Sequence, residues 1–236
     1  VLGDATIFAF NPAFEASGEP YDRPSDRLTL ASLKVEKKLP WFGGSTFTSL
    51  TGLQQRSAAQ RDDVNAYNGN WVEGYGFDDS YNASLEPSFA DFTTRIRQLT
   101  QEFRLQSEGT GPWQFVSGLF YNRLRQHDGI LYDFRGSQQA LLDANGLSGT
   151  ITFDGKDGFR ETQTALFGDL NYALTPLWKL SAGLRWTHYS QTLDRFSRSP
   201  AFGDDVGSGD RLSASARKVT PRLSLSYQPQ DDFLAY

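Results

Sequence analysis

The sequence predicts an all-β fold: an antiparallel, up-and-down transmembrane β-barrel, of which this chain supplies about nine strands. Three observations predict it. Apolar and polar side chains alternate strictly along a long segment, 178–187. The connections between the expected strands alternate between long and short. Two tryptophans, Trp178 and Trp186, are spaced like the borders of an apolar band.

The alternation is clearest in the segment 178–187, where the period of two residues is that of a β-strand. A strand there has one apolar face and one polar face, and it exceeds the usual length of about 5–6 residues. The apolar positions are Trp178, Leu180, Ala182, Leu184 and Trp186, and the polar positions are Lys179, Ser181, Gly183, Arg185 and Thr187. We expect the tryptophan face to meet lipid and the Lys179/Arg185 face to meet a lumen.

The remaining strands follow from shorter versions of the same pattern between Gly-, Pro- and Asp-rich breaks. In chain order we expect strands at 4–10, 27–36, 45–55, 93–106, 113–125, 159–173, 177–192 and 217–228, and a last one from 233 that the end of the sequence interrupts.

Long and short connections decide between a soluble sheet and a barrel. The long ones are 11–26, 56–92, 127–158 and 193–216, and the short ones are 37–44, 107–112, 174–176 and 229–232. Outer-membrane barrels have short periplasmic turns and long outer loops. The two tryptophans are about 26 Å apart along a strand, or roughly 20 Å vertically at barrel tilt, which suits an apolar band about 25 Å tall.

Composition restricts the function more than the fold. The chain has 236 residues and no cysteine, so disulfides and thiolate metal sites are excluded. A net charge of -5 argues against a nucleic-acid partner. No apolar run reaches the roughly 18 residues of a membrane-spanning helix, but that test does not detect barrel strands.

Five segments, taken in this order, resemble the barrel of TonB-dependent outer-membrane receptors. They are FTSLTGLQQR (47–56), LTQEFRLQS (99–107), PWQFVSGLFYNR (112–123), ALFGDLNYALTPLWKLSAGLRWTHYS (165–190) and KVTPRLSLSYQPQDDFLAY (218–236). The resemblance covers the chain from residue 27 onward.

The resemblance implies a barrel of about 22 strands closed by an N-terminal plug domain. Such receptors import a scarce nutrient of siderophore, cobalamin or carbohydrate type across the outer membrane of Gram-negative bacteria. Its partners would be outer-membrane lipid, the nutrient and the TonB complex, which acts through the plug region. We interpret residues 1–236 as part of one barrel domain, with no plug domain, TonB box or terminal barrel strand among them.

The candidate ligand-binding residues are aromatic and basic side chains in the expected outer loops, because aromatic rings on polar loops can stack on sugars, chelates and macrocycles. Packing of a long loop on itself explains the same aromatics equally well. The candidates are Tyr67, Trp71, Tyr75, Phe77 and Tyr81 in the first long loop, and Tyr132 and Arg135 in the second. Inward polar residues are expected to line the lumen and contact the plug, among them Glu102, Arg104, Arg185 and Arg222.

Catalysis is not expected. His188 and Ser190 have the H-x-S spacing of outer-membrane phospholipases, but no Asn or Asp follows in a matching context. A polar strand end at the membrane border is the favoured interpretation. His127 and His188 are the only histidines, so we expect no metal site and no cofactor.

Two other functions remain open from the sequence. A passive porin-like or adhesive outer-membrane barrel would need neither plug nor TonB. A soluble carbohydrate-binding β-protein would use the same aromatics without a membrane.

Overall fold

The computed structural model describes residues 24–63, 89–133, 146, 149–230 and 233–236. They form one sheet of eight strands with two short 3-10 helices at the hairpin ends. The strands are β1 (Ser25–Leu39), β2 (Ser45–Asp63), β3 (Phe89–Ser107), β4 (Trp113–Asp133), β5 (Ile151–Ala173), β6 (Trp178–Ser199), β7 (Asp204–Gln230) and β8 (Phe233–Ala235), and the helices are η1 (Trp41–Gly43) and η2 (Pro200–Phe202).

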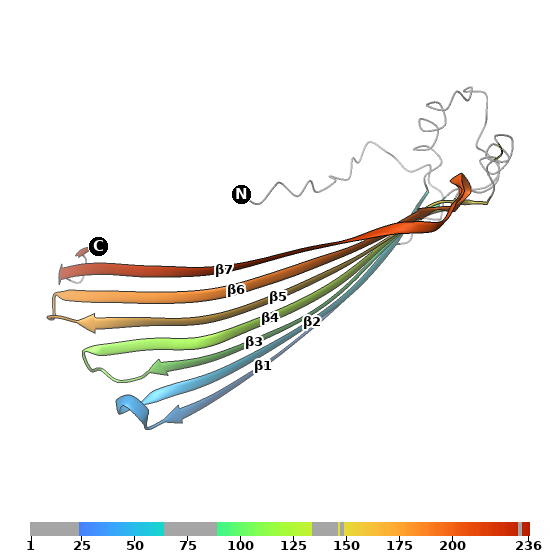
Figure 1. Ribbon diagram of the computed structural model, residues 1–236. Helices are drawn as coiled ribbons and strands as arrows, with labels where there is room; N and C mark the ends of the chain where they lie inside the picture. The colour runs from blue at the N-terminus through green and yellow to red at the C-terminus, as the bar shows by residue number, and fades with distance from the viewer. Residues whose placement is uncertain (1–23, 64–88, 134–145, 147–148, 231–232) are drawn as a thin grey trace.

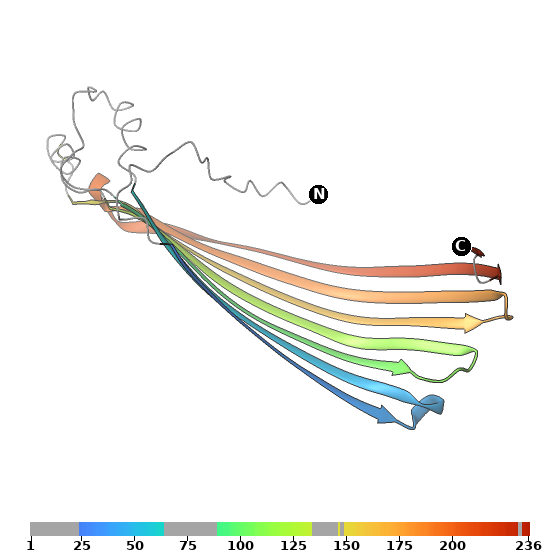
Figure 2. The same cartoon turned by 180° about the vertical axis from the view of Figure 1, so that it is seen from behind.

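Every strand pairs antiparallel with its neighbour in the chain, in the order β1 to β8. Figure 1 shows the seven long strands side by side as one curved sheet, and Figure 2 shows the same single layer from behind. This is the predicted up-and-down topology. We call the end of the sheet that carries residues 40–44, 108–112 and 174–177 the turn end, and the opposite end the loop end.

The turn between β5 and β6 shows why the chain reverses at Thr175 and Pro176. The Thr175 Oγ1 accepts hydrogen bonds from the backbone N–H groups of Leu177 (3.2 Å) and Trp178 (3.1 Å). The N–H of Leu174 donates to the carbonyl of Trp178 at 2.9 Å. The Thr175 hydroxyl oxygen therefore accepts from the two N–H groups that follow Pro176, which has no N–H of its own to donate.

Register places the apolar side chains of successive strands on one face of the sheet. Directly opposed residues of an antiparallel pair lie on the same face. One such line across five strands consists of Val219, Trp186, Leu166, Leu119 and Phe103. The predicted apolar set of β6 therefore belongs to an apolar face shared by the whole sheet, and Lys179 and Arg185 lie on the opposite, polar face.

The apolar face is the more exposed of the two. Along β2 the odd positions from 53 to 59 are exposed and the even positions from 54 to 60 are half-buried, and β3 repeats this from 93 to 100. Side chains crowd on the concave side of a curved sheet and spread on the convex side, so the apolar face is convex. Leucines remain uncovered on it, with exposed fractions of 54% for Leu166, 56% for Leu184 and 75% for Leu223.

The sheet has almost no buried core. Among the described residues, the buried hydrophobic side chains are Phe89, Ala90, Ala165 and Ala201. A soluble protein of this size would cover most of its large apolar residues, because exposed patches on soluble monomers rarely exceed a few hundred Å². No helix within the described part of the chain has the length and apolar character needed to cross a membrane.

The apolar residues form a band that crosses the strands obliquely. Val219 on β7 and Phe103 on β3 lie on the same register line across the sheet. Toward the loop end, the band stops at Val219 on β7. On β3 it continues four residues beyond Phe103, to Leu99. Four residues are about 13 Å along a strand, and four strand spacings are about 19 Å. The border is therefore inclined by about 35° to the perpendicular of the strands, close to the tilt of barrel strands.

Aromatic pairs mark the border of the band at the turn end. The rings of Trp113 and Tyr172 stack at 4.0 Å between centroids, and those of Trp178 and Tyr227 lie 4.6 Å apart. Trp178 and Tyr227 are direct register partners of β6 and β7. Rows of aromatic residues at the edge of an apolar band are typical of membrane barrels.

Three expected long connections are shorter than predicted, because the strands extend further toward the loop end. The predicted loop 193–216 is wrong: β6 continues to Ser199 and β7 begins at Asp204, with only η2 between them. Likewise β2 reaches Asp63 and β3 begins at Phe89, while β4 reaches Asp133 and β5 begins at Ile151. In these extensions apolar and polar side chains no longer alternate regularly, so the pattern that signals a strand is lost although backbone pairing continues. The expected strand 4–10 lies outside the described residues.

Candidate functional site on the polar face

A hydrogen-bonded chain of polar side chains crosses four strands on the concave, polar face. Gln98 on β3 donates to Asn122 on β4 (2.8 Å), and the Asn122 amide donates to Glu161 on β5 (3.3 Å). The Tyr189 hydroxyl on β6 lies 2.9 Å from the other Glu161 oxygen and 3.0 Å from Gln191 Oε1. Asn122 is only 5% exposed, so these hydrogen-bonded side chains order the middle of the polar face. Ordered polar side chains of this kind can contact a hydrated ligand or a second polar domain.

Closer to the turn end, an ion pair reaches across an intervening strand. The Asp169 carboxylate on β5 lies 3.0 Å from an Arg222 guanidinium nitrogen on β7. Gly183 on β6 is the register partner of both residues. A Cβ atom at Gly183 would overlap the Asp169 carboxylate, so glycine leaves the space through which this ion pair forms.

A second glycine supports a stacked pair next to it. The Phe167 ring lies over Gly118, where a Cβ atom would overlap both the ring and the Phe103 carbonyl oxygen. The Arg185 guanidinium lies 5.7 Å from the centre of the Phe167 ring, within cation–π range. Arg104 pairs with Glu102 on the same face.

The polar residues expected to point inward, Glu102, Arg104, Arg185 and Arg222, thus share the polar face. Register places Arg104, Gly118, Phe167 and Arg185 on one line across it. Beside that line a hollow of about 360 Å³ is lined by Arg104, Gln114, Phe167 and Asn171, among others.

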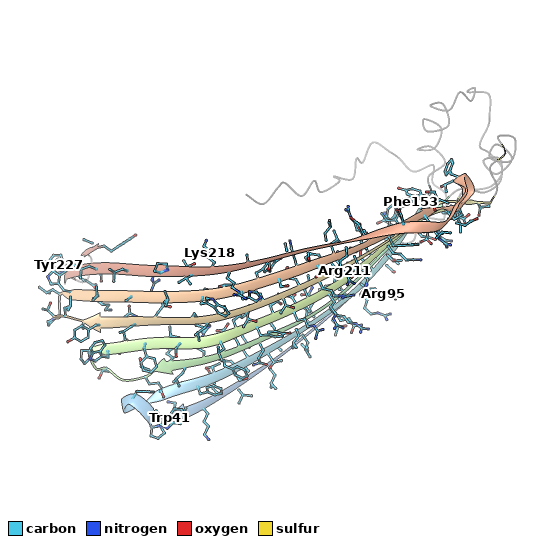
Figure 3. All side chains as sticks on the ribbon, viewed as in Figure 1. Trp41, Arg95, Phe153, Arg211, Lys218 and Tyr227 are labelled. Atoms are coloured by element: carbon cyan, nitrogen blue, oxygen red, sulfur yellow. The ribbon has the colours of Figure 1, made fainter. Side chains whose placement is uncertain are left out.

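An aromatic cluster lies on the polar face at the loop end. The Tyr132 ring packs edge-on against Phe92 (6.4 Å between centroids) and Phe153 (6.1 Å). Ala90, directly opposite Tyr132, is fully buried beside it. Figure 3 shows Phe153 at the loop end of the sheet, far from Trp41 and Tyr227 at the turn end.

The sequence-predicted ligand residues are only partly described. Tyr132 lies in β4 and not in a loop, so its predicted loop position is wrong: backbone pairing with β3 and β5 continues through it. Tyr67, Trp71, Tyr75, Phe77, Tyr81 and Arg135 lie outside the described residues.

Neither histidine forms an ion pair with a carboxylate of the described residues. The His188 ring stacks on Trp186 at 6.3 Å on the apolar face, and Ser190 follows on the same face. No group of three metal-ligating side chains occurs within the ranges that the structure describes.

The sequence did not reveal the hydrogen bonds that connect the side chains from Gln98 to Gln191 across four strands. Alternation assigns each residue to a face, but partners on different strands depend on register, which the turn lengths determine. The signal available was the set of Gln, Asn and Glu residues at the polar positions of neighbouring strands.

Comparison with known families decides what this face belongs to. The family described as "TonB dependent receptor-like, beta-barrel" matches residues 3–236. The chain belongs to the TonB-dependent receptor β-barrel family. A comparison with curated protein sequences returned no match.

One solved receptor structure shares the fold. The ferric yersiniabactin uptake receptor FyuA of Yersinia pestis matches with a TM-score of 0.61 and 17% identity, over 90% of this chain and 28% of that one. The siderophore receptor PiuA of Acinetobacter baumannii (TM-score 0.49, 15% identity, 89% of this chain and 31% of that one) and the unliganded ferric citrate transporter FecA (0.48, 15%, 90% and 26%) also match. The chain spans about a third or less of the length of these structures.

Proposed function

We propose that this chain is part of the barrel of an outer-membrane receptor that takes up a scarce nutrient by TonB-dependent active transport. The family match over residues 3–236 is the observation that carries the proposal. In this arrangement the convex, apolar face meets lipid, with strands tilted by about 35°. The concave face lines the lumen, and other strands and a plug domain of the complete receptor close the barrel.

The proposal assigns two roles to the polar face. Its ordered side chains, from Gln98 to Gln191 and around Arg104, contact the plug, which requires a polar surface of fixed shape. Its loop end, at Tyr132, contacts the nutrient together with the other predicted candidates, Tyr67, Trp71, Tyr75, Phe77, Tyr81 and Arg135.

Catalysis plays no part. The nutrient is of siderophore, cobalamin or carbohydrate type; FyuA is named for a ferric siderophore, and we extend that substrate class to this receptor as the first to test.

Uptake by cells that carry the complete gene product tests the proposal. We expect accumulation of labelled ferric siderophore, cobalamin or oligosaccharide that stops when the proton gradient is collapsed or TonB is deleted. Nutrient binding to the outside of the cells should persist under both conditions, because capture precedes the energised step.

Two results would contradict the proposal. Uptake that continues without TonB would indicate a passive porin-like barrel. A gene product that stays soluble without detergent would exclude the membrane location and favour a carbohydrate-binding β-protein. Tyr132→Ala tests the ligand site separately: we expect weaker binding of the nutrient and unchanged TonB dependence.

A further inference from the structure

We propose that an arginine patch on the convex face, at the loop-end border of the apolar band, binds the phosphate groups of anionic membrane lipids. The patch lies on β3, β4 and β5. It consists of Arg95, Arg97, Arg123, Arg125 and Arg160. The proposal uses the membrane orientation proposed above but not the transport activity.

Register brings three of these arginines directly opposite one another. Arg97 on β3 is the partner of Arg125 on β4, and Arg125 is the partner of Arg160 on β5. Neighbouring strands are about 4.8 Å apart, and like charges directly opposite each other destabilise a sheet. A row of three guanidinium groups therefore calls for anions to neutralise it.

The sheet supplies little of that neutralisation. Arg160 lies 3.2 Å from Asp194 on β6. Within the described part of the chain, Arg95, Arg97, Arg123 and Arg125 form no ion pair with a carboxylate. All four are exposed. Figure 3 shows Arg95 on β3, toward the loop end of the sheet.

Within the described residues, Arg211 on β7 has a carboxylate partner, unlike the patch arginines of β3 and β4. Arg211 pairs with the same Asp194 carboxylate that accepts Arg160. One acidic residue on β6 thus pairs with arginines of both β5 and β7. Among the residues that the structure describes, no carboxylate plays that part for the arginines of β3 and β4.

The patch adjoins an apolar surface. A hollow of about 440 Å³ on this face is lined by apolar residues (Ala31, Leu53 and Leu99), by arginines (Arg97, Arg123 and Arg125) and by neutral polar residues (Thr29, Gln54, Gln55 and Gln98). Leu99 and Arg123 are direct register partners, so the border between apolar and basic surface passes through the hollow.

A phosphorylated lipid matches both parts of this surface. Guanidinium groups bind phosphate oxygens through paired, charge-assisted hydrogen bonds. The acyl chains of the same lipid would cover Leu53 and Leu99. A free phosphate would leave these leucines exposed, and the patch lies at the height where lipid headgroups meet the apolar band. We therefore assign the site to a lipid headgroup.

Lipid binding to the complete gene product tests this assignment. The protein is placed in phosphatidylcholine nanodiscs or micelles and titrated with dioleoylphosphatidic acid, with phosphatidylcholine as the neutral competitor, and bound lipids are counted by native mass spectrometry. We expect a preference for phosphatidic acid of about tenfold or more that decreases as salt is added. Equal binding of the two lipids would overturn the proposal.

Variants locate the site. The triple variant R97Q/R123Q/R125Q should lose the preference. The matched control R104Q/R185Q/R222Q removes the same number of charges from the polar face and should retain it. Equal losses in both variants would show a general charge effect and overturn the assignment.

Folding and transport are separated from lipid binding. R97K/R123K/R125K keeps the charge and should retain most of the preference. If the triple glutamine variant does not fold, the double variant R97Q/R125Q replaces it and should weaken the preference. A full preference in that folded double variant would overturn the assignment. The lipid preference is measured without nutrient, so it stands or fails independently of uptake. A protein that binds neither micelle nor nanodisc contradicts the membrane orientation itself.

Discussion

Two positions on the polar face, Gly118 and Gly183, leave no room for a Cβ atom, and different neighbouring atoms occupy the space at each. At Gly183 the obstacle is the end of a flexible side chain, the Asp169 carboxylate. At Gly118 it includes the carbonyl oxygen of Phe103, which is held in the β3–β4 ladder. A side chain can rotate away, whereas a backbone atom in a sheet cannot.

We therefore predict that Gly118→Ala lowers the free energy of unfolding by about 1–3 kcal/mol, as overpacking does, and that Gly183→Ala costs less than about 1 kcal/mol. Gly183→Ala should nevertheless abolish the coupling between Asp169 and Arg222. A double-mutant cycle on these two residues, measured by urea unfolding in both backgrounds, checks this. The pair is partly exposed, so the coupling to be lost is about 0.2–1 kcal/mol. An unchanged coupling in the alanine background would show that the ion pair does not need the glycine.

The sequence correctly predicted the face of the sheet on which a side chain lies, but it did not predict which side chains of other strands that residue contacts. Alternation placed Trp178 and Trp186 on one face and Lys179 and Arg185 on the other, as the register confirms. It could not show that Asp169 pairs with Arg222 two strands away, because that contact depends on the lengths of two turns and on the missing side chain of Gly183.

At the scale of elements, the β6–β7 hairpin extends beyond the apolar band on polar contacts. Asp194 is bonded to Arg211 on β7 and lies near Arg160 on β5, and Arg195 pairs with Asp210 at 2.9 Å. The hydrogen bond and charge of Arg211, aided by the charge of Arg160, hold the pKa of Asp194 below its usual value.

This lowered pKa predicts an acid-sensitive hairpin. A carboxyl group with a depressed pKa in the folded state stabilises that state above its unfolded pKa of about 3.9, and the contribution is lost as the pH falls through the folded value. Hydrogen exchange of the amides near 190–199 and 204–213, corrected for intrinsic rates, should therefore increase below about pH 4 more than that of the amides within the band. In the Asp194→Asn variant, the extra increase in exchange of the hairpin amides at low pH should be smaller, because this side chain no longer titrates. Identical pH profiles in the wild type and in this variant would contradict the assignment.

The same hairpin explains why the strands were underestimated from the sequence. Strand prediction relied on a continuous apolar face, and the apolar residues among 193–216 are too scattered to form one. Cross-strand ion pairs maintain the ladder there instead, and they are visible only once register brings Asp194 opposite Arg211. The strands within the apolar band, by contrast, were placed correctly, because apolar positions repeat every second residue there.

At the scale of the whole molecule, the sheet separates an apolar surface from a polar one along its entire width. The described strands bury little against each other except through backbone pairing, so stability depends on what covers the convex face. The band of exposed leucines and the aromatic pairs at its turn-end border are explained together if lipid covers that face.

Substitution of two adjacent residues tests this division. Leu170 lies on the convex face of β5 between Tyr172 and Leu166, near the middle of the band, and Asn171 lies on the concave face next to it. We predict that Leu170→Arg lowers the free energy of unfolding of the complete gene product in phosphatidylcholine vesicles by about 2–4 kcal/mol, because a guanidinium must enter hydrocarbon. Asn171→Arg should cost less than about 1 kcal/mol, even though it removes the hydrogen bond from Ser181, because the new charge faces a hydrated surface. If Asn171→Arg is the more damaging change, the two faces have been assigned in the wrong sense; equal costs would mean that neither face contacts lipid.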